Sequence, residues 1–496
     1  MARIEPEVSL PQVIRTVLAA LCACAALVPA ASHAVYLSPD GLGQALIFPY
    51  YTTRSVDGGN AYNTFVSIVN HTADAKAIRV RFREGKNGRV VGNFNLFLGP
   101  RDTWVAALAA PPDNSLPARV LVPDNSCALP AFTPLNGSLP YLDLSNVAYT
   151  GDFADGLGTG NDRTREGYVE AIEMATMTGG AAAGVTIGSN GRPVDCTALD
   201  GVIATAPPTG GLSGTLTLLN VQSGLDFTVN ADALAQLSLF PFYRAANDPY
   251  PDFNAGEVLV SGVLIAADRN YRMTWTSGFD AVSAALMRKT VDNELILDSA
   301  TQSSTDWIVT FPTKRFYGTA PGSAGPFAAS LNADRRSIPF QIDVQARDGV
   351  NTHYTANCGF TCPPGNVAIP LQLEWASTVV GFRNAALAGG AAGTSGALGS
   401  TNAWIVSLPS AFQNGSASLL FDGINATPRM GPASTRTFNL ATGDAVTETM
   451  RVEGLPAVGF AVRTFRNGNL TCTGAATCQG NYGGIYPHEG RRSVVP

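Results

Sequence analysis

One segment near the start of the chain alternates strictly between apolar and polar residues. Residues 78–83 read Ile-Arg-Val-Arg-Phe-Arg, which places the apolar side chains on one side of an extended strand and the arginines on the other. Asn87-Gly88 follows, a dipeptide that favours a two-residue hairpin turn, and alternation resumes over residues 90–98. The pattern predicts an antiparallel hairpin with one buried and one solvated face. The side chains expected on the solvated face are Arg79, Arg81 and Arg83.

Short segments of this kind recur along the chain, whereas helical periodicity is rare. Further strands are expected throughout, at 44–50, 62–70, 103–107, 165–178, 214–221 and 225–229 and at eight places between 306 and 464. Residues 280–288 have the spacing of a short helix with Asp280 as its N-cap, and residues 231–237 are expected to form a helical turn. The fold class is therefore mostly β, with two sandwich-like antiparallel regions, 35–300 and 301–496, long loops and one or two short helices.

The first 34 residues have the features of a signal peptide. Arg3 and Arg15 form a modest positive region before an apolar run at residues 16–31 that is too short to span a bilayer comfortably. Small residues before Val35 predict cleavage after Ala34, so we expect an exported protein, extracellular or at the outer cell surface, with the periplasm as an alternative. A lipid anchor at Cys24 is a second alternative, because residues 21–24 loosely resemble a lipobox. No later run is long and apolar enough for a transmembrane helix.

Six cysteines follow the expected cleavage site, and an even number in an exported chain predicts disulfides. Proximity in the sequence favours the pairs Cys358–Cys362 and Cys472–Cys478, which leaves Cys127–Cys196. Six cysteines allow 15 pairings, so this connectivity is one hypothesis among several. Zinc ligation by Cys358 and Cys362 is the competing interpretation, although no second pair at zinc-site spacing lies near them.

The arginine row raises the question of an anionic partner. The chain carries a formal charge of −6, and the row has no aromatic neighbours on its face for base stacking. We therefore expect a solvated strand face and no nucleic-acid binding. A contact with an anionic glycan or a lipid headgroup stays open as an alternative.

Two acidic loops offer oxygen ligands. Residues 151–162 read Gly-Asp-Phe-Ala-Asp-Gly-Leu-Gly-Thr-Gly-Asn-Asp, and calcium accepts flexible cages of such ligands. The spacing matches no EF-hand, so a solvated loop is the alternative, and residues 248–257 form a second stretch of this kind. The candidate calcium ligands are Asp152, Asp155, Asn161 and Asp162; no other cofactor is indicated.

Catalytic patterns are weak. Glu166, Glu170 and Glu173 could include a glycosidase acid and base, but Glu170 and Glu173 should point to opposite faces of a strand, and exposed charge is the favoured interpretation. No nucleophile elbow occurs, and the histidines after the signal segment, at positions 71, 353 and 488, are far apart in the sequence. We expect no catalytic residues, although a triad assembled from distant residues stays open.

Several phrases together resemble a family of uncharacterised exported proteins of Gram-negative bacteria, sometimes labelled cell-surface proteins. The phrases lie at residues 41–52, 165–168, 280–283, 305–317 and 481–484. The resemblance implies export and a surface location, and it brings no activity or site residue. Within residues 305–317 we expect Trp307, Val309, Phe311 and Tyr317 to be core or an aromatic platform, and Lys314-Arg315 to be exposed.

These features predict a non-catalytic, exported surface or extracellular protein with a structural or adhesive role. Its partner would be a surface polymer or another protein. The alternative is a secreted glycan-binding module or carbohydrate-active hydrolase. A row of aromatics with two carboxylates beside a cleft would favour the hydrolase, and an unpaired strand edge would favour assembly.

Overall fold

In the computed structural model, the described part of the chain is residues 34–496 without 57–58, 112, 114, 133, 135–138, 202, 255–259, 267–268, 318–324, 328–337, 348–350, 355–370, 385–392, 422–427, 433, 440–444 and 473–474. The predicted signal segment up to residue 33, with Cys24, lies outside it. So do Cys358 and Cys362.

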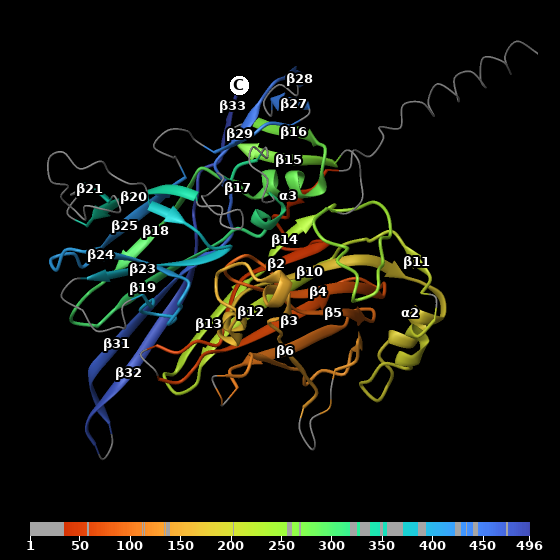
Figure 1. Cartoon of the computed structure of the whole chain (residues 1–496), viewed down its shortest axis with the longest axis horizontal. Coiled ribbons are helices and arrows are strands. Elements are labelled where there is room, and N and C mark those ends of the chain that lie inside the picture. The colour runs from red at the N-terminus through yellow and green to blue at the C-terminus, as the bar shows by residue number, and fades with distance from the viewer. Residues whose placement is uncertain are drawn as a thin grey trace, which may run out of the picture.

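Two antiparallel sheets form a sandwich from the first half of the chain (Figure 1). The larger sheet contains, in spatial order, β1 (Tyr36–Leu37), β14 (Asp232–Ala235), β2 (Ala45–Thr52), β10 (Glu166–Met177), β4 (Lys76–Glu84), β5 (Val90–Leu98) and β8 (Cys127–Leu129), and β11 (Thr205–Ala206) pairs with β10. The smaller sheet contains β13 (Leu225–Asn230), β12 (Leu212–Asn220), β3 (Asn63–Asn70), β6 (Thr103–Ala109), β7 (Arg119–Leu121) and β9 (Tyr141–Asp143).

The alternating pattern accounts for the core between these two sheets. Val80 and Phe82 of β4, Val66 of β3 and Leu216 of β12 are almost fully buried there in one cluster, together with Trp104 of β6. The predicted hairpin is present, because β4 and β5 pair in antiparallel register from Lys76–Leu98 to Arg83–Val90.

The rest of the chain forms further sheets (Figure 1). Four strands form one: β15 (Val260–Ala266), β16 (Arg269–Trp275), β27 (Ser434–Asn439) and β28 (Ala445–Glu448). A second contains β18 (Thr290–Ile296), β25 (Asn414–Leu420), β20 (Ile338–Ala346) and β21 (Asn351–Tyr354), with β22 (Leu371–Leu373) on β20. A third contains β24 (Ala403–Leu408), β23 (Ser377–Asn384), β19 (Ser304–Thr310), β31 (Phe460–Cys472) and β32 (Ala475–Pro487).

Two small sheets and a few short helices complete the described elements. The sheets are β17 (Met287–Arg288) with β30 (Leu455–Pro456), and β26 (Arg429–Met430), β29 (Arg451–Glu453) and β33 (Ser493–Val495). The helices are α2 (Gly179–Val185) and α3 (Gly278–Leu286), with 3-10 turns η1 (Val147–Tyr149), η2 (Gly151–Phe153), η3 (Asn161–Arg165), η4 (Cys196–Leu199) and η5 (Lys314–Phe316). The predicted mostly-β fold with antiparallel sheets and few short helices is confirmed.

Two local predictions are wrong. Residues 232–235 form strand β14 between β1 and β2 instead of a helical turn. Helix α3 starts after Ser277, so Asp280 lies in its first turn and accepts a hydrogen bond from the Ser277 hydroxyl at 2.5 Å.

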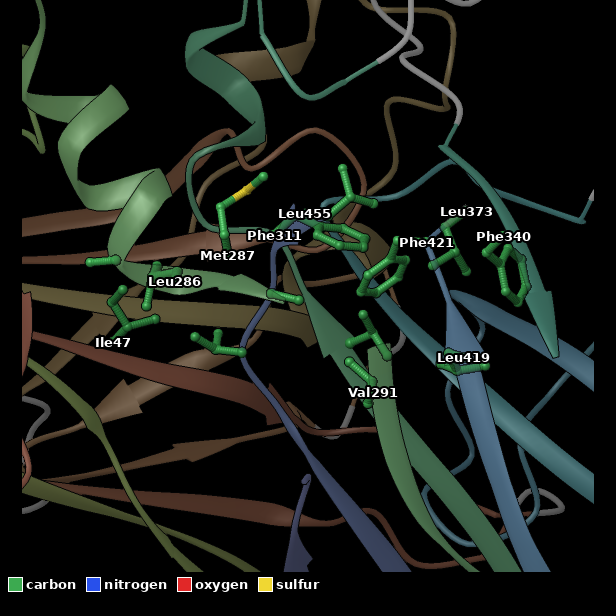
Figure 2. Close-up of a cluster of buried hydrophobic side chains, with 14 of the residues drawn as sticks. Ile47, Leu286, Met287, Val291, Phe311, Phe340, Leu373, Leu419, Phe421 and Leu455 are labelled. Carbon is green, nitrogen blue, oxygen red and sulfur yellow. The ribbon is translucent and has the colours of Figure 1, made fainter. Parts of the chain in front are cut away.

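The two halves of the chain share sheets and a core. β16 pairs with β27 and β18 with β25, so strands from either side of residue 300 lie in the same sheets. Figure 2 shows the common core, in which Ile47 of β2 lies beside Leu286 of α3, with Val291 and Leu419 farther along the same apolar layer. No helix in the described ranges is long and apolar enough to cross a membrane.

Candidate functional site

The arginine row is buried, which corrects the prediction of a solvated face. Arg79, Arg81 and Arg83 are at most 4% exposed. The reason is a second layer: residues 244–251, which we call the covering segment, cross the outer face of β4 and β5. A strand pattern shows which residues share a face, but it does not show whether another part of the chain covers that face.

Arg79 and Arg81 hold the covering segment through its backbone. Arg79 donates to the carbonyl oxygens of Ala245 at 2.7 Å and Asp248 at 2.9 Å. Arg81 donates to those of Pro249 and Pro251, both at 2.6 Å. Charged donors make strong hydrogen bonds to carbonyls, so the row fixes an irregular segment that has no Val, Leu, Ile, Met or Phe of its own.

Arg83 belongs to a buried ionic group. Its Nε lies 2.6 Å from Glu170 Oε2, and Arg315 Nη1 lies 2.7 Å from Glu170 Oε1. Burial raises the pKa of Glu170, but the two guanidinium groups outweigh burial and hold the pKa below its usual range. This carboxylate therefore stays ionised and is a poor general acid.

The other two glutamates are buried as well, so the prediction of exposed charge is wrong for all three. Glu166 accepts from Arg54 Nε at 3.2 Å and from the hydroxyls of Ser400 and Thr401 at 2.5 and 2.7 Å. Burial raises the pKa of Glu166, but these donors outweigh burial and lower the pKa overall. Glu173 lies 2.7 Å from Lys76 Nζ, and burial raises its pKa overall.

Glu170 and Glu173 do point to opposite faces, as predicted. Glu170 is opposite Arg81 on β4, whereas Glu173 is opposite Ile78. They therefore do not face a common cleft, which a glycosidase pair requires.

The acidic loop at residues 151–162 is tied into the fold by arginine. Asp155 receives two bonds from Arg163, at 2.8 and 2.9 Å, and one from Asn87 at 2.7 Å. Asn161 donates to the Ser115 carbonyl, and Asp152 is exposed. In the described ranges no group of three or more His, Cys, Asp or Glu side chains is placed to hold a metal ion. Calcium binding by Asp152, Asp155, Asn161 and Asp162 stays a prediction. One of these proposed ligands, Asp155, already accepts hydrogen bonds from Arg163.

The longest-range predicted disulfide is present. Cys127 on β8 and Cys196 on η4 are bonded, with 5.6 Å between their Cα atoms. Cys472 lies on β31 and Cys478 on the paired strand β32, and this pairing stays a prediction.

The described histidines lie in separate environments. His71 Nε2 lies 2.8 Å from the Ser213 hydroxyl at the surface. His488 is buried between Asn293 and the Ile308 carbonyl, 3.1 and 3.0 Å away, and burial lowers its pKa to about 3. His353 lies on β21. His71 and His488 each have a local hydrogen-bonding role.

Residues 305–317 form core and not a surface platform. Trp307, Val309, Phe311 and Tyr317 are at most 3% exposed. Lys314 and Arg315 were expected to be exposed, but Lys314 is buried with its ammonium donating to the Glu374 carbonyl, and Arg315 is half-buried against Glu170.

Most of the predicted polar residues are bound into the fold, and the most distinctive surface feature is the hairpin β31–β32 (Figure 1). β31 pairs with β19 only at residues 461–464, so beyond Thr464 the ribbon has two strands. β32 is the last strand of its sheet among the described elements. Its thirteen residues include no Asp, Glu, Lys or Arg.

The two faces of β32 differ. Asn481 donates to the Ser223 carbonyl at 2.8 Å, and Ile485 packs on the core, so this face lies against the body. Tyr482 and Tyr486 point the other way and are 55% and 37% exposed. The Arg463 guanidinium lies 3.8 Å over the Tyr486 ring and fixes it.

Sequence reasoning identified β31 only in part and did not identify β32. Residues 458–464 were expected as strand, but residues 475–487 have too many glycines and polar residues for a periodic signal. The only sequence sign of the edge was the resemblance phrase at residues 481–484.

Comparison with protein-family models, with curated proteins and with solved structures returned no match.

Proposed function

We propose that this chain is a non-catalytic, exported protein of the cell surface or extracellular space that associates with another protein strand through the edge of β32. The observation that carries the proposal is an uncharged edge strand that has no further strand beside it among the described elements, although the carbonyls of Tyr486 and Pro487 accept from Asn293. Native proteins protect such edges with charges, prolines or bulges because unpaired backbone groups recruit further strands. The pairing of β31 with β32 is irregular between residues 467 and 472 of β31, whereas residues 480–487 of β32 pair in regular register.

Stability of the ribbon points the same way. An isolated two-stranded hairpin is marginal in water, and a third strand is normally needed. Beyond Thr464, where β19 ends its pairing, contacts of one face with the body support the ribbon, and a strand added to β32 would stabilise it further. Tyr482 and Tyr486 would then lie on one face of the extended sheet, where aromatic cross-strand pairs are favourable.

Export is supported by the disulfide Cys127–Cys196, since such bonds persist in oxidising compartments. A non-catalytic role is supported by Glu166 and Glu170, which are ionised, buried and saturated with donors. The alternative, a carbohydrate-active hydrolase, would need two carboxylates facing one cleft.

The test uses a charge on the edge. Tyr482→Lys places a protective lysine on β32. Val194→Lys is the matched control, because Val194 is 66% exposed and is distant from β32 in the sequence. Taking a second copy as the default partner, we expect sedimentation velocity to show concentration-dependent dimers for the wild type and Val194→Lys. Tyr482→Lys should weaken the dimer by tenfold or more. A wild type that stays monomeric up to ~100 µM and captures no β-strand peptide, or a dimer that Tyr482→Lys leaves intact, would refute the proposal.

A further inference from the structure

A basic hollow of about 660 Å³ opens beside the buried arginine row. Its walls are the turn between β4 and β5, the covering segment and η5. The volume lies within the range of ligand pockets, about 300–1,000 Å³. Its cationic lining residues are Arg81, Arg83, Lys86, Arg89, Lys314 and Arg315, against two carboxylates, Asp248 and Asp252.

The positive charge of the hollow is only partly compensated. Arg83 and Arg315 share a single carboxylate, that of Glu170. Arg81 is bonded to backbone carbonyls, and within the described ranges no carboxylate lies within ion-pair distance of it. Burial, with Arg83 and Arg79 nearby, lowers the pKa of Arg81 to about 9. An anion in the hollow would restore the missing counter-charge.

One cation at the wall is available to a ligand. Arg89 is half-buried, and its guanidinium forms no hydrogen bond or ion pair with the described residues. Lys86 lies on the same turn, and its ammonium donates to the Leu157 carbonyl at 2.7 Å. Burial, with Arg163 nearby, lowers the pKa of Lys86, which indicates that this ammonium is partly removed from solvent.

The hollow has acceptors as well as cations. Asn93 lines it, and the Oδ1 atom of Asn93 is buried without a hydrogen-bond partner in the described structure. Asp248 and Asp252 add carboxylate oxygens. A bare phosphate or sulfate ion has little to donate to these atoms, and the two carboxylates would repel it. Sugar hydroxyls donate hydrogen bonds and would satisfy the two carboxylates, whereas the buried Asn93 Oδ1 is out of reach of a ligand.

An aromatic wall completes the arrangement. Phe316 lines the hollow and is half-buried, and its ring stacks on Phe279 at 4.9 Å with an interplanar angle of 7°. The Arg315 guanidinium lies 4.0 Å over the same ring. With Phe279 and Arg315 over its faces, the Phe316 ring presents an apolar edge to the hollow, and the cations and acceptors fix the orientation of a polar ligand.

We propose that this hollow is a binding site for an acidic saccharide, a sugar that carries carboxylate or sulfate groups. The anionic group meets Arg89 and the guanidiniums of Arg81, Arg83 and Arg315, and the hydroxyls meet Asp248 and Asp252. The site is independent of association through β32, so a monomeric Tyr482→Lys chain is expected to retain it.

Titration calorimetry on the full exported chain tests the site with four probes. They are a galacturonic acid trimer, a sulfated disaccharide, a neutral galactose trimer and inorganic phosphate. We expect binding of one or both acidic sugars, weaker at high salt because screening acts on charged contacts. Binding of the neutral trimer and of phosphate should be at least tenfold weaker.

Arg89→Glu is the decisive variant, because Arg89 has no structural partner in the described ranges and its loss should not unfold the chain. The matched control is Arg192→Glu, the same charge change at an exposed loop position outside the hollow. Arg89→Glu should reduce affinity for the acidic sugar by tenfold or more, and Arg192→Glu should leave it unchanged. The proposal falls if no acidic sugar binds, if phosphate or the neutral sugar binds equally well, or if the two variants behave alike.

Discussion

Replacing Glu170 with glutamine should be among the most damaging single changes in the chain. The substituted amide would keep the shape of the side chain but remove the charge between Arg83 and Arg315. Its carbonyl oxygen can accept from one guanidinium, but its NH2 group would face the other guanidinium. Two hydrogen-bond donors would then meet without an acceptor. Removing one member of a buried ion pair costs about 3–5 kcal/mol because the remaining charge stays buried and unpaired. Glu170→Gln should therefore lose about that much free energy of unfolding, a large part of the ~5–15 kcal/mol typical of a folded protein.

Urea unfolding at pH 7, followed by tryptophan fluorescence, measures this loss, since Trp104 and Trp307 are fully buried. The matched control is Asp143→Asn. Asp143 also pairs with an arginine, Arg119 at 2.6 Å, but the two side chains are 42% and 30% exposed. Exposed pairs contribute about 0–1 kcal/mol, so this variant should unfold almost like the wild type. Equal effects of the two variants, or a loss below about 1 kcal/mol for Glu170→Gln, would show that burial of the ionic group does not stabilise the fold as argued.

Two further predictions concern the same buried polar groups. Changing Arg79, Arg81 and Arg83 together to threonine should lower the free energy of unfolding in urea by at least about 4 kcal/mol. The carbonyls of the covering segment would lose their donors, at about 1–3 kcal/mol each. A change within about 1 kcal/mol, as for ordinary surface residues, would contradict the structural role of the buried arginines. His488 has its pKa lowered from 6.5 to about 3 by burial, so the unfolded chain takes up a proton that the folded chain excludes, and stability should fall as pH falls below 6.5. His488→Asn should flatten that dependence between pH 6.5 and 4, whereas replacement of the exposed His71 should not change it.

Local patterns predicted the strands well and their surroundings poorly. The alternation of residues 78–83 located β4 and its inward face correctly, because Val80 and Phe82 pack in the core. It could not reveal that Arg79 and its neighbours lie beneath residues 244–251, since that segment has no periodicity and is distant in the sequence. The short apolar stretch 231–237 is compatible with helix or strand, and pairing with β1 and β2 decided for strand.

The candidate sites show the same limit. The Cys127–Cys196 bond was predicted because it remains once the cysteines that are close in the sequence are paired with each other. The hollow could not be found in this way, because Arg89, Asn93, Asp248 and Arg315 come from three separate parts of the chain. A useful signal was nevertheless present: Lys86 and Arg89 extend the arginine row into the hairpin turn, and Lys314-Arg315 adds a second basic pair. Only the fold brings these groups together.

The sharing of sheets across residue 300 bears on how the chain matures. β16 needs β27, and β18 needs β25, partners that lie more than a hundred residues later. During synthesis the chain emerges progressively, so these strands lack their partners until the last quarter of the sequence has been made. The first sandwich can close early, whereas the remainder must be kept from pairing with wrong partners in the meantime. Escort by a holding chaperone and sensitivity to premature termination follow from the topology alone.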